Sequence, residues 1–289
     1  MIGRLRVGVV GVGRLGFHHA RLVAARGDAV LAGVVDADDC RARHVAGELG
    51  TRAFESLEAL LDRCDAAIIA APATAHGRLA LAALDRGVHV LVEKPLAASV
   101  GEAEALVAAA AWARAVLHVG HCERFNPQFR ALAARCRAAR RFAAVRLSPR
   151  LGAADVSAAL DLLVHDIDLA CALSGGRVEE VRARESTRPD RVRTRLTFST
   201  GQVVELVAAR GARRAVRRWR AYDSAGAHDA DLLAGAGGGL LPAVHEAFVS
   251  AIRRRSDGGV GGRAGLEAVR IAHRVMEAAR LARDGALAA

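Results

Sequence analysis

Lysine is almost absent from this sequence. Of the 42 Lys and Arg residues among 289, Lys94 is the one lysine, so 41 are arginines. Where either side chain could serve as a solvated cation, the sequence has arginine, and a position that escapes this bias is a candidate for chemistry that arginine cannot perform. Lysine is a compact donor whose pKa falls on burial and which can exchange a proton, whereas arginine stays protonated. We therefore expect Lys94 to be functional.

Aromatic residues, paired cysteines and long apolar runs are also scarce. Phe, Trp and Tyr make up 3% of the chain and the arginines are interleaved with acids, so the net charge of +11 does not indicate a nucleic-acid partner. The five cysteines are odd in number and form no C-x-x-C motif, which predicts neither a disulfide framework nor a metal site. No run approaches the ~18 to 20 apolar residues of a membrane span. We expect a cytoplasmic protein without a membrane partner.

The length and the hydrophobic pattern predict two domains. A chain of 289 residues exceeds the roughly 100 to 200 expected per domain. In residues 1–121, runs rich in Val and Ile alternate with segments of helical spacing, which indicates a doubly wound parallel sheet, or Rossmann domain. The expected strands are Arg6–Val10, Val30–Val35, Ala66–Ala71, Val88–Val92 and Val116–Val119, and the expected helices are Leu15–Ala25, Asp39–Leu49, Ser56–Leu61, His76–Arg86 and Val100–Ala113.

Residues 122–289 show a different order of elements. A long helix is expected first, then strands joined by short polar or glycine-containing turns, which favours antiparallel pairing. The expected helix is Val156–Leu173, the strands are Val178–Glu185, Val192–Phe198, Val203–Ala209 and Ala215–Tyr222, and two helices at Ala243–Arg254 and Gly265–Arg283 end the chain. We predict an α+β domain with a mainly antiparallel open sheet; the alternative for the final helices is that they pack back on the first domain.

A glycine-rich segment follows the first expected strand. Gly11-Val12-Gly13-Arg14-Leu15-Gly16 matches G-x-G-x-x-G and opens a helix, so its glycines suit a tight turn and the close approach of a pyrophosphate. Asp36 ends the next strand, 20 residues beyond Gly16, where a carboxylate accepts both ribose hydroxyls. This predicts NAD. NADP is disfavoured but stays open, because Arg41 could hold a 2′-phosphate or stack on adenine.

Two further segments follow expected strands of the first domain. Ala71, Pro72, Thr74 and His76 are expected to face the nicotinamide ribose, against the alternatives of a plain loop and of a histidine that merely begins a helix. Glu93-Lys94-Pro95 follows Val88–Val92, which puts Glu93 and Lys94 at the carboxyl rim of the sheet beside the nicotinamide.

The second domain carries a group of ionisable residues at helical spacing. Asp161 and His165 are at i and i+4 and Asp168 is three further on, so an α-helix would place all three on one face. In a cleft, such a histidine would take a proton and a carboxylate would orient it, whereas the alternative is an exposed polar stripe. Arg124, which suits an anion, and Asn126, the one asparagine, lie earlier and either touch substrate or brace the domain junction.

Together these motifs resemble the Gfo/Idh/MocA family of nicotinamide-dependent oxidoreductases over essentially the whole chain. The shared features are the glycine motif with His19-Ala20, Pro72-x-x-x-His76, Glu93-Lys94-Pro95 and Asp161-x-x-x-His165. The resemblance implies a sugar or cyclitol hydroxyl as substrate, substrate-binding and catalytic roles for Lys94, Asp161 and His165, and a homo-oligomer, dimer or tetramer, through the sheet of the second domain.

A narrower resemblance concerns members that oxidise the 3-hydroxyl of UDP-N-acetylglucosamine for lipid A biosynthesis. It depends on residues 121–127 and 161–169 and adds Arg124, Asn126 and Asp168 to the expected substrate contacts. The chain departs from many members in having Ser157-Ala158-Ala159 where they have a glycine pair. Dehydrogenases or reductases for another sugar or cyclitol, and a non-catalytic NAD-sensing regulator, remain the alternatives.

Overall fold

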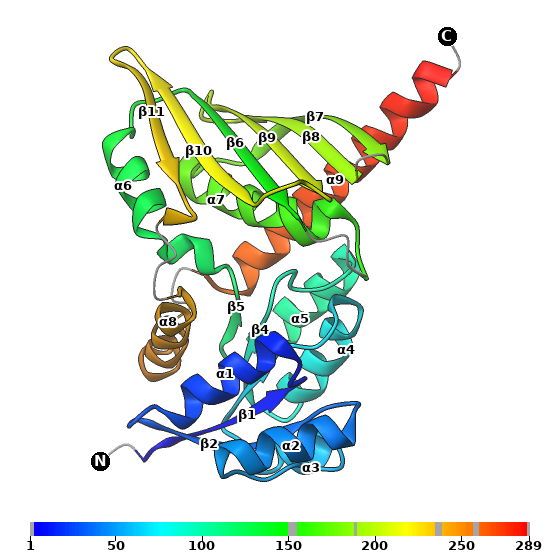
Figure 1. The fold of residues 1–289 in the computed structure, drawn as a ribbon, viewed down its shortest axis with the longest axis vertical. Helices are drawn as coiled ribbons and strands as arrows, with labels where there is room; N and C mark the ends of the chain where they lie inside the picture. Colours follow the sequence, from blue (N-terminus) through cyan, green and yellow to red (C-terminus); the bar gives the residue numbers. More distant parts are fainter. Residues whose placement is uncertain (1–2, 150–154, 188–189, 235–238, 257–259, 288–289) are drawn as a thin grey trace. The chain divides into compact units, whose positions relative to one another are not determined.

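The computed structural model describes residues 3–149, 155–187, 190–234, 239–256 and 260–287. The chain divides into two compact units (Figure 1). Unit 1 comprises Met1–Gly120 and Val244–Leu266, and unit 2 comprises His121–Ala243 and Glu267–Ala289. Unit 1 therefore includes most of α8 (Leu241–Arg254) and the first turn of α9 (Gly262–Leu287).

A five-stranded parallel sheet forms unit 1, in the order β2-β1-β3-β4-β5. Its strands are β1 (Leu5–Val10), β2 (Ala29–Val35), β3 (Ala66–Ile69), β4 (His89–Val92) and β5 (Leu117–Val119). Its other helices are α1 (Arg14–Ala24), α2 (Asp39–Leu49), α3 (Leu57–Leu61), α4 (Ala73–Leu84) and α5 (Val100–Trp112). All residues of β3 and β5 are buried, as expected for strands covered on both faces. The predicted doubly wound sheet is confirmed.

Helix α8 returns to the first sheet through two aromatic contacts. The ring of His245 in α8 stacks on His19 in α1, and Phe248 packs against His118 of β5. All four side chains are buried. A helix distant in sequence therefore completes the core of unit 1.

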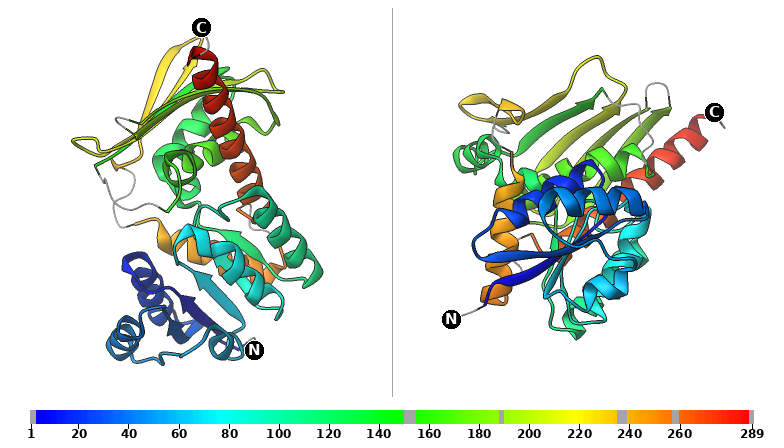
Figure 2. Two further views of the ribbon diagram at one scale, coloured as in Figure 1. Left: turned by 90° about the vertical axis from the view of Figure 1, so that its right-hand side faces the viewer. Right: turned by 60° about the horizontal axis from the view of Figure 1, so that its bottom comes forward.

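Unit 2 is built on a six-stranded sheet in the order β11-β10-β6-β9-β8-β7. Its pairs are antiparallel except β6 with β9, which confirms the expected mainly antiparallel sheet. The strands are β6 (Arg141–Ser148), β7 (Val178–Thr187), β8 (Asp190–Phe198), β9 (Val203–Arg210), β10 (Val216–Asp223) and β11 (Gly226–Asp231). Helices α7 (Val164–Ser174) and α9 lie on one face of this sheet (Figures 1 and 2).

Three regular elements of unit 2 are additional to the sequence prediction: β6, β11 and α6 (Pro127–Arg135). The signal for α6 was present, because Asn126 caps the helix by accepting the N–H of Gln128 and Pro127 occupies its first turn. The predicted continuous helix Val156–Leu173 is wrong in part: a π-helical segment, η2 (Ala159–Leu163), precedes α7.

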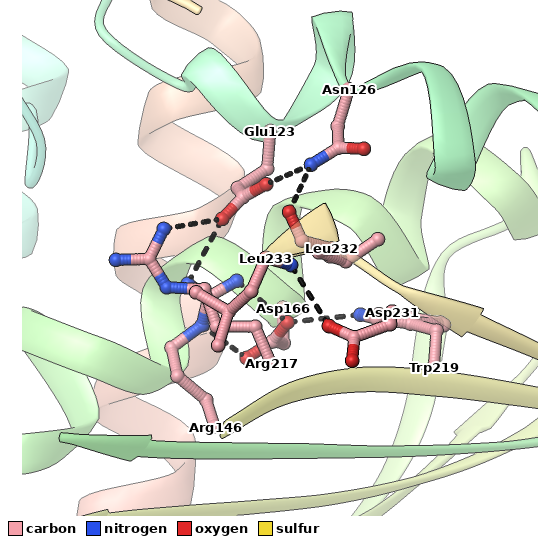
Figure 3. A network of polar contacts seen from close by, with 9 residues as sticks. All are labelled: Glu123, Asn126, Arg146, Asp166, Arg217, Trp219, Asp231, Leu232 and Leu233. Atoms are coloured by element: carbon pink, nitrogen blue, oxygen red, sulfur yellow. Dashed lines mark hydrogen bonds and ion pairs between the residues drawn. The ribbon is translucent and has the colours of Figure 1, made fainter. Parts of the chain in front are cut away.

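Unit 2 contains a buried network of charges (Figure 3). Arg146 of β6 donates two hydrogen bonds to Asp166 of α7, at 2.7 and 3.0 Å, and one to Glu123 of η1 (Cys122–Phe125), at 3.1 Å. The buried Trp219 indole also donates to Asp166, at 2.9 Å. Burial by itself would lower the pKa of Arg146, but the charges and hydrogen bonds of Asp166 and Glu123 outweigh it and raise that pKa above its ordinary value.

No described helix combines the length and the apolar character that crossing a membrane requires.

The buried network makes a prediction about stability. Arg146→Met leaves Asp166 and Glu123 buried without their shared countercharge, so we expect it to lower the free energy of unfolding by about 3–5 kcal/mol. Urea denaturation followed by tryptophan fluorescence, to which the buried Trp219 contributes, measures this. The control is Arg217→Met, because Arg217 also bonds Glu123 but its side chain is 40% exposed, and we expect a loss below about 1 kcal/mol. Equal losses in the two variants would contradict the assigned role of the network.

Candidate active site

The three glycines of the G-x-G-x-x-G segment differ in backbone conformation and in the space around them. Gly11 has φ +81°, and a Cβ there would lie 2.9 Å from the backbone of Ala70 and Ala71. A Cβ on Gly16 would lie 1.8 Å from the carbonyl oxygen of Gly11. At Gly13 the backbone is extended, and among the described residues no atom beyond its chain neighbours lies within 4 Å of the position that a Cβ would take. The fold itself therefore requires Gly11 and Gly16, whereas Gly13 leaves room for a group that approaches from outside.

The amino end of α1 is suited to an anion. Gly13 is the N-cap residue, it provides no side-chain cap, and the first turn has no acidic residue. The helix dipole therefore gives this end an uncompensated positive potential. Val12 is buried, while Arg14 and Leu15 are exposed. Such a cradle fits the pyrophosphate of the dinucleotide predicted from the sequence.

Asp36 and Arg41 lie against this cradle. One carboxylate oxygen of Asp36 accepts the backbone N–H of Val12 at 2.7 Å, and the other accepts from Arg41 at 3.3 Å. Arg41 also donates to Asp38 at 2.9 Å, so two carboxylates share its charge. A 2′-phosphate would meet these two carboxylates, whereas ribose hydroxyls can donate to Asp36. The arrangement fits NAD better than NADP.

His76 connects the loops that follow β3 and β4. Its Nε2 lies 2.9 Å from the carbonyl oxygen of Ala71 and its Nδ1 lies 2.7 Å from that of Pro95. The imidazole is buried, whereas Pro72 and Thr74 of the same segment are exposed. His76 therefore braces the carboxyl edge of the sheet, where the glycine segment, residues 71–76 and Lys94 all lie within unit 1.

A buried chain of polar groups stands behind Lys94. The backbone N–H of Lys94 donates to Glu93 at 3.2 Å, and the other oxygen of Glu93 lies 3.0 Å from Nε2 of His19. Nδ1 of His19 lies 2.8 Å from Nε2 of His245. Burial alone would raise the pKa of Glu93, but His19 and then Lys94 hold it below its ordinary value.

The buried groups Glu93, His19 and His245 affect one another electrostatically. The Glu93 carboxylate accepts a hydrogen bond from Nε2–H of His19, and Nδ1 of His19 faces Nε2 of His245. Burial first, and then the charge of His19, lowers the pKa of His245 to about 3, which keeps it neutral near pH 7. A Cβ at Gly120 would lie 2.6 Å from the Glu93 carboxylate, so that glycine makes room for it. His19 belongs to a sequence motif, whereas no motif or spacing indicates the roles of His245 and Gly120.

In unit 2, Asp161 and His165 do not have the α-helical relation that their spacing predicts. Asp161 lies in the π-helical segment η2, whereas His165 lies in α7. The prediction of one α-helix through Asp161, His165 and Asp168 is therefore wrong for Asp161, because η2 interrupts the α-helical repeat, whereas His165 and Asp168 both lie in α7. Arg210 of β9 holds the Asp161 carboxylate at 3.2 Å, and both side chains keep some exposure. Single-turn π-helices are frequent at functional sites.

Asp168 is placed to orient Arg124. Its carboxylate is 1% exposed and accepts two hydrogen bonds from Arg124, at 2.6 and 2.7 Å. Burial would lower the pKa of Arg124, but its bonds to Asp168 raise it. Asn126 is fully buried, and its amide donates to Glu123 and to the carbonyl oxygen of Leu232. The side chain of Asn126 thus joins η1 to the segment after β11 within unit 2.

The chain is similar to known oxidoreductases in sequence and in fold. A family model described as an oxidoreductase family with an NAD-binding Rossmann fold, GFO_IDH_MocA, matches residues 5–121. A UDP-N-acetylglucosamine 3-dehydrogenase of Acidithiobacillus ferrooxidans is 38% identical over 75% of this chain and 71% of its own length. Its solved structure superposes with a TM-score of 0.89, at 34% identity, over 96% of this chain and 98% of that one.

Two other similarities are broader. A myo-inositol 2-dehydrogenase of Thermotoga maritima is 29% identical over 64% of this chain and 60% of its own length. The protein GenD2 from gentamicin A biosynthesis, solved in complex with NAD, has a TM-score of 0.90 over 97% of this chain and 95% of that one, at 22% identity, which shows the same fold.

The glycine segment makes a prediction about cofactor binding. Because Gly13 is extended and open, Gly13→Ala should leave the thermal stability of the cofactor-free protein unchanged but weaken NADH binding at least about tenfold, since the methyl group occupies the approach of the pyrophosphate. Calorimetric titration with NADH measures the affinity. Gly16→Ala is the contrasting variant and should destabilise the protein itself. Wild-type NADH affinity in Gly13→Ala would refute this assignment.

Proposed function

The chain belongs to the Gfo/Idh/MocA family of NAD-binding oxidoreductases, and from this premise we propose that it oxidises the 3-hydroxyl of UDP-N-acetylglucosamine. As a member it is an NAD(P)-dependent dehydrogenase that acts on a CH–OH group. The observation that carries the specific proposal is the similarity to UDP-N-acetylglucosamine 3-dehydrogenase, which extends over both units rather than the Rossmann fold alone. The similarity therefore includes unit 2, which carries the residues proposed to contact the substrate.

Lys94, Asp161 and His165 supply the proposed chemistry. Bound NAD provides the hydride acceptor. His165 removes the proton of the substrate hydroxyl, and Lys94 donates a hydrogen bond to the oxygen as negative charge develops on it. The carbinol carbon thus loses a hydride, its oxygen loses a proton, and a ketone forms. Asp161, held by Arg210, is proposed to orient Lys94 or His165.

Arg124 is the proposed contact for the anionic part of the substrate. The Arg124 side chain is 18% exposed while that of Asp168, which binds it, is almost fully buried, so Asp168 fixes the orientation of the guanidinium. A diphosphate is the part of a nucleotide sugar that such a fork suits. Asn126 contributes through the position of α6, whose amino end it caps.

A 3-keto amino sugar is the kind of product that an aminotransfer reaction converts to a diamino sugar. On this basis we propose a role in lipid A biosynthesis, and we propose the cytoplasm as its compartment. We also propose that it forms a dimer or tetramer through the sheet of unit 2, which light scattering tests directly. A second candidate substrate is a cyclitol, because inositol dehydrogenases are among the similar proteins.

Turnover with two substrates tests the proposal. With NAD present, we expect UDP-N-acetylglucosamine to produce NADH, followed by its near-ultraviolet absorbance, and myo-inositol to give at most about a hundredth of that kcat/KM, because an inositol offers no diphosphate to Arg124. An aminotransferase or a ketone trap keeps the oxidation from stopping at equilibrium. Faster turnover of the inositol would transfer the proposal to cyclitols. NADH binding without turnover of either substrate would favour a regulatory protein.

Lys94→Arg tests the assigned role of the one lysine. The substitution keeps the positive charge but removes the compact ammonium and its proton exchange, so we expect kcat to fall about 10²-fold or more while NADH affinity stays within a few-fold. The exchange Arg86→Lys, at an exposed helix end, is the matched control and should leave kcat unchanged. A kcat within a few-fold of wild type in Lys94→Arg would remove Lys94 from the mechanism.

A further inference from the structure

Cys136, Asp223 and His228 form a cluster in unit 2, away from the residues proposed for catalysis. One potential ligand atom from each, a sulfur, a carboxylate oxygen and an imidazole nitrogen, lies within 4.8 Å of the other two. Nε2 of His228 is 3.1 and 3.2 Å from the two carboxylate oxygens of Asp223. Within the part of the chain that the structure describes, no other group of His, Cys, Asp and Glu meets this distance.

The hairpin β10–β11 brings two of these residues to one face of the sheet. Asp223 pairs with Gly226 and Ala221 pairs with His228, so Asp223 and His228 are diagonal neighbours on the same side. The backbone N–H of Ala225 donates to Asp223 at 2.9 Å and fixes the orientation of the carboxylate. Both side chains are 20% exposed, so an ion can reach them from solvent.

Helix α6 supplies the third residue. Its buried residues Phe129 and Leu132 precede Cys136 at intervals of three and four, which is the spacing of one helix face. Phe129 packs edge-on against Trp219 of β10, and α6 also contacts β11. Because Trp219 and Asp223 are four residues apart on one strand, they share a face, and Cys136 at the end of α6 lies over the turn of the hairpin.

The chemistry of the three groups selects a class of ion. Thiolate, imidazole and carboxylate together are zinc ligands, whereas Mg²⁺ and Ca²⁺ prefer oxygen. The bond from Ala225, followed by His228, keeps the pKa of Asp223 below its ordinary value, so this ligand is already charged. A metal ion binds the thiolate form of cysteine, so its binding would displace the proton of the Cys136 thiol.

We propose that Cys136, Asp223 and His228 bind a thiophilic divalent cation of the Zn²⁺ class, with solvent as the fourth ligand. The ion would join the carboxyl end of α6 to the turn between β10 and β11. Its role is to stabilise this edge of unit 2, and it takes no part in hydride transfer. The absence of a C-x-x-C motif does not bear on this site, because the ligands come from three separate elements.

Cobalt titration of the metal-stripped full-length protein tests the proposal. Co²⁺ replaces Zn²⁺ at such sites and gives a thiolate-to-metal charge-transfer band. We expect a band that saturates at about one Co²⁺ per chain and disappears when Zn²⁺ is added. Cys136→Ser should abolish the band and Cys40→Ser, at an exposed cysteine, should retain it. The absence of a band in the wild type, or its persistence in Cys136→Ser, would overturn the proposal.

A second variant guards against a folding defect in Cys136→Ser. His228→Gln changes a partly exposed side chain and should weaken Co²⁺ binding at least about tenfold while the circular dichroism spectrum is unchanged. Zn²⁺ should raise the midpoint of thermal unfolding of the wild type by several degrees and leave that of His228→Gln unchanged. Equal Zn²⁺ shifts in the two proteins would contradict the assignment. NADH affinity should be the same with and without Zn²⁺, which separates this test from that of the catalytic proposal.

Discussion

The buried guanidinium of Arg146 is the interaction on which the organisation of unit 2 depends. It joins η1, β6 and α7 through Glu123 and Asp166, and these are the elements that carry Arg124 and His165. A buried charge is costly without partners, so any arrangement of α7 that separates Asp166 from Arg146 is strongly disfavoured. The ion pairs therefore fix the relative positions of η1, β6 and α7 more than they add to net stability. These positions also determine where the neighbouring residues proposed for catalysis lie.

In unit 1, close backbone contacts and a pair of histidines fix the positions of the elements around Lys94. Gly16 allows α1 to approach the turn at Gly11, and His19 on the same helix reaches Glu93 next to Lys94. The ionised Glu93 is satisfied by His19 and, through it, by His245 from a helix more than 200 residues later. The electrostatic surroundings of Lys94 thus depend on α8, although α8 contains none of the residues proposed to bind the cofactor.

The sequence was sufficient for elements whose signal is local. The alternation of Val-rich strands with helices predicted the parallel sheet, and the glycine motif with Asp36 predicted the geometry found at α1. Strand β6 was missed because Arg146 occupies an inward position after Phe142 and Ala144, where a charge breaks the expected apolar alternation. Its partners, Glu123 and Asp166, are 23 and 20 residues away, and His245 is 226 residues from His19. Such pairings are properties of the tertiary fold, and no spacing rule encodes them.

The π-helical segment before α7 has a consequence for how this family member could change. A π-turn is equivalent to one residue inserted into an α-helix, so it re-aims the residues on one side of it and leaves the other side undisturbed. Removing Leu162 or Leu163, which lie between Asp161 and His165, would restore the regular helix and change the direction of Asp161 around the helix axis relative to His165. A single codon deletion would then redirect one carboxylate while α7 and its buried ion pairs keep their place. A mutation can in this way change the direction of the Asp161 side chain separately from the stability of α7.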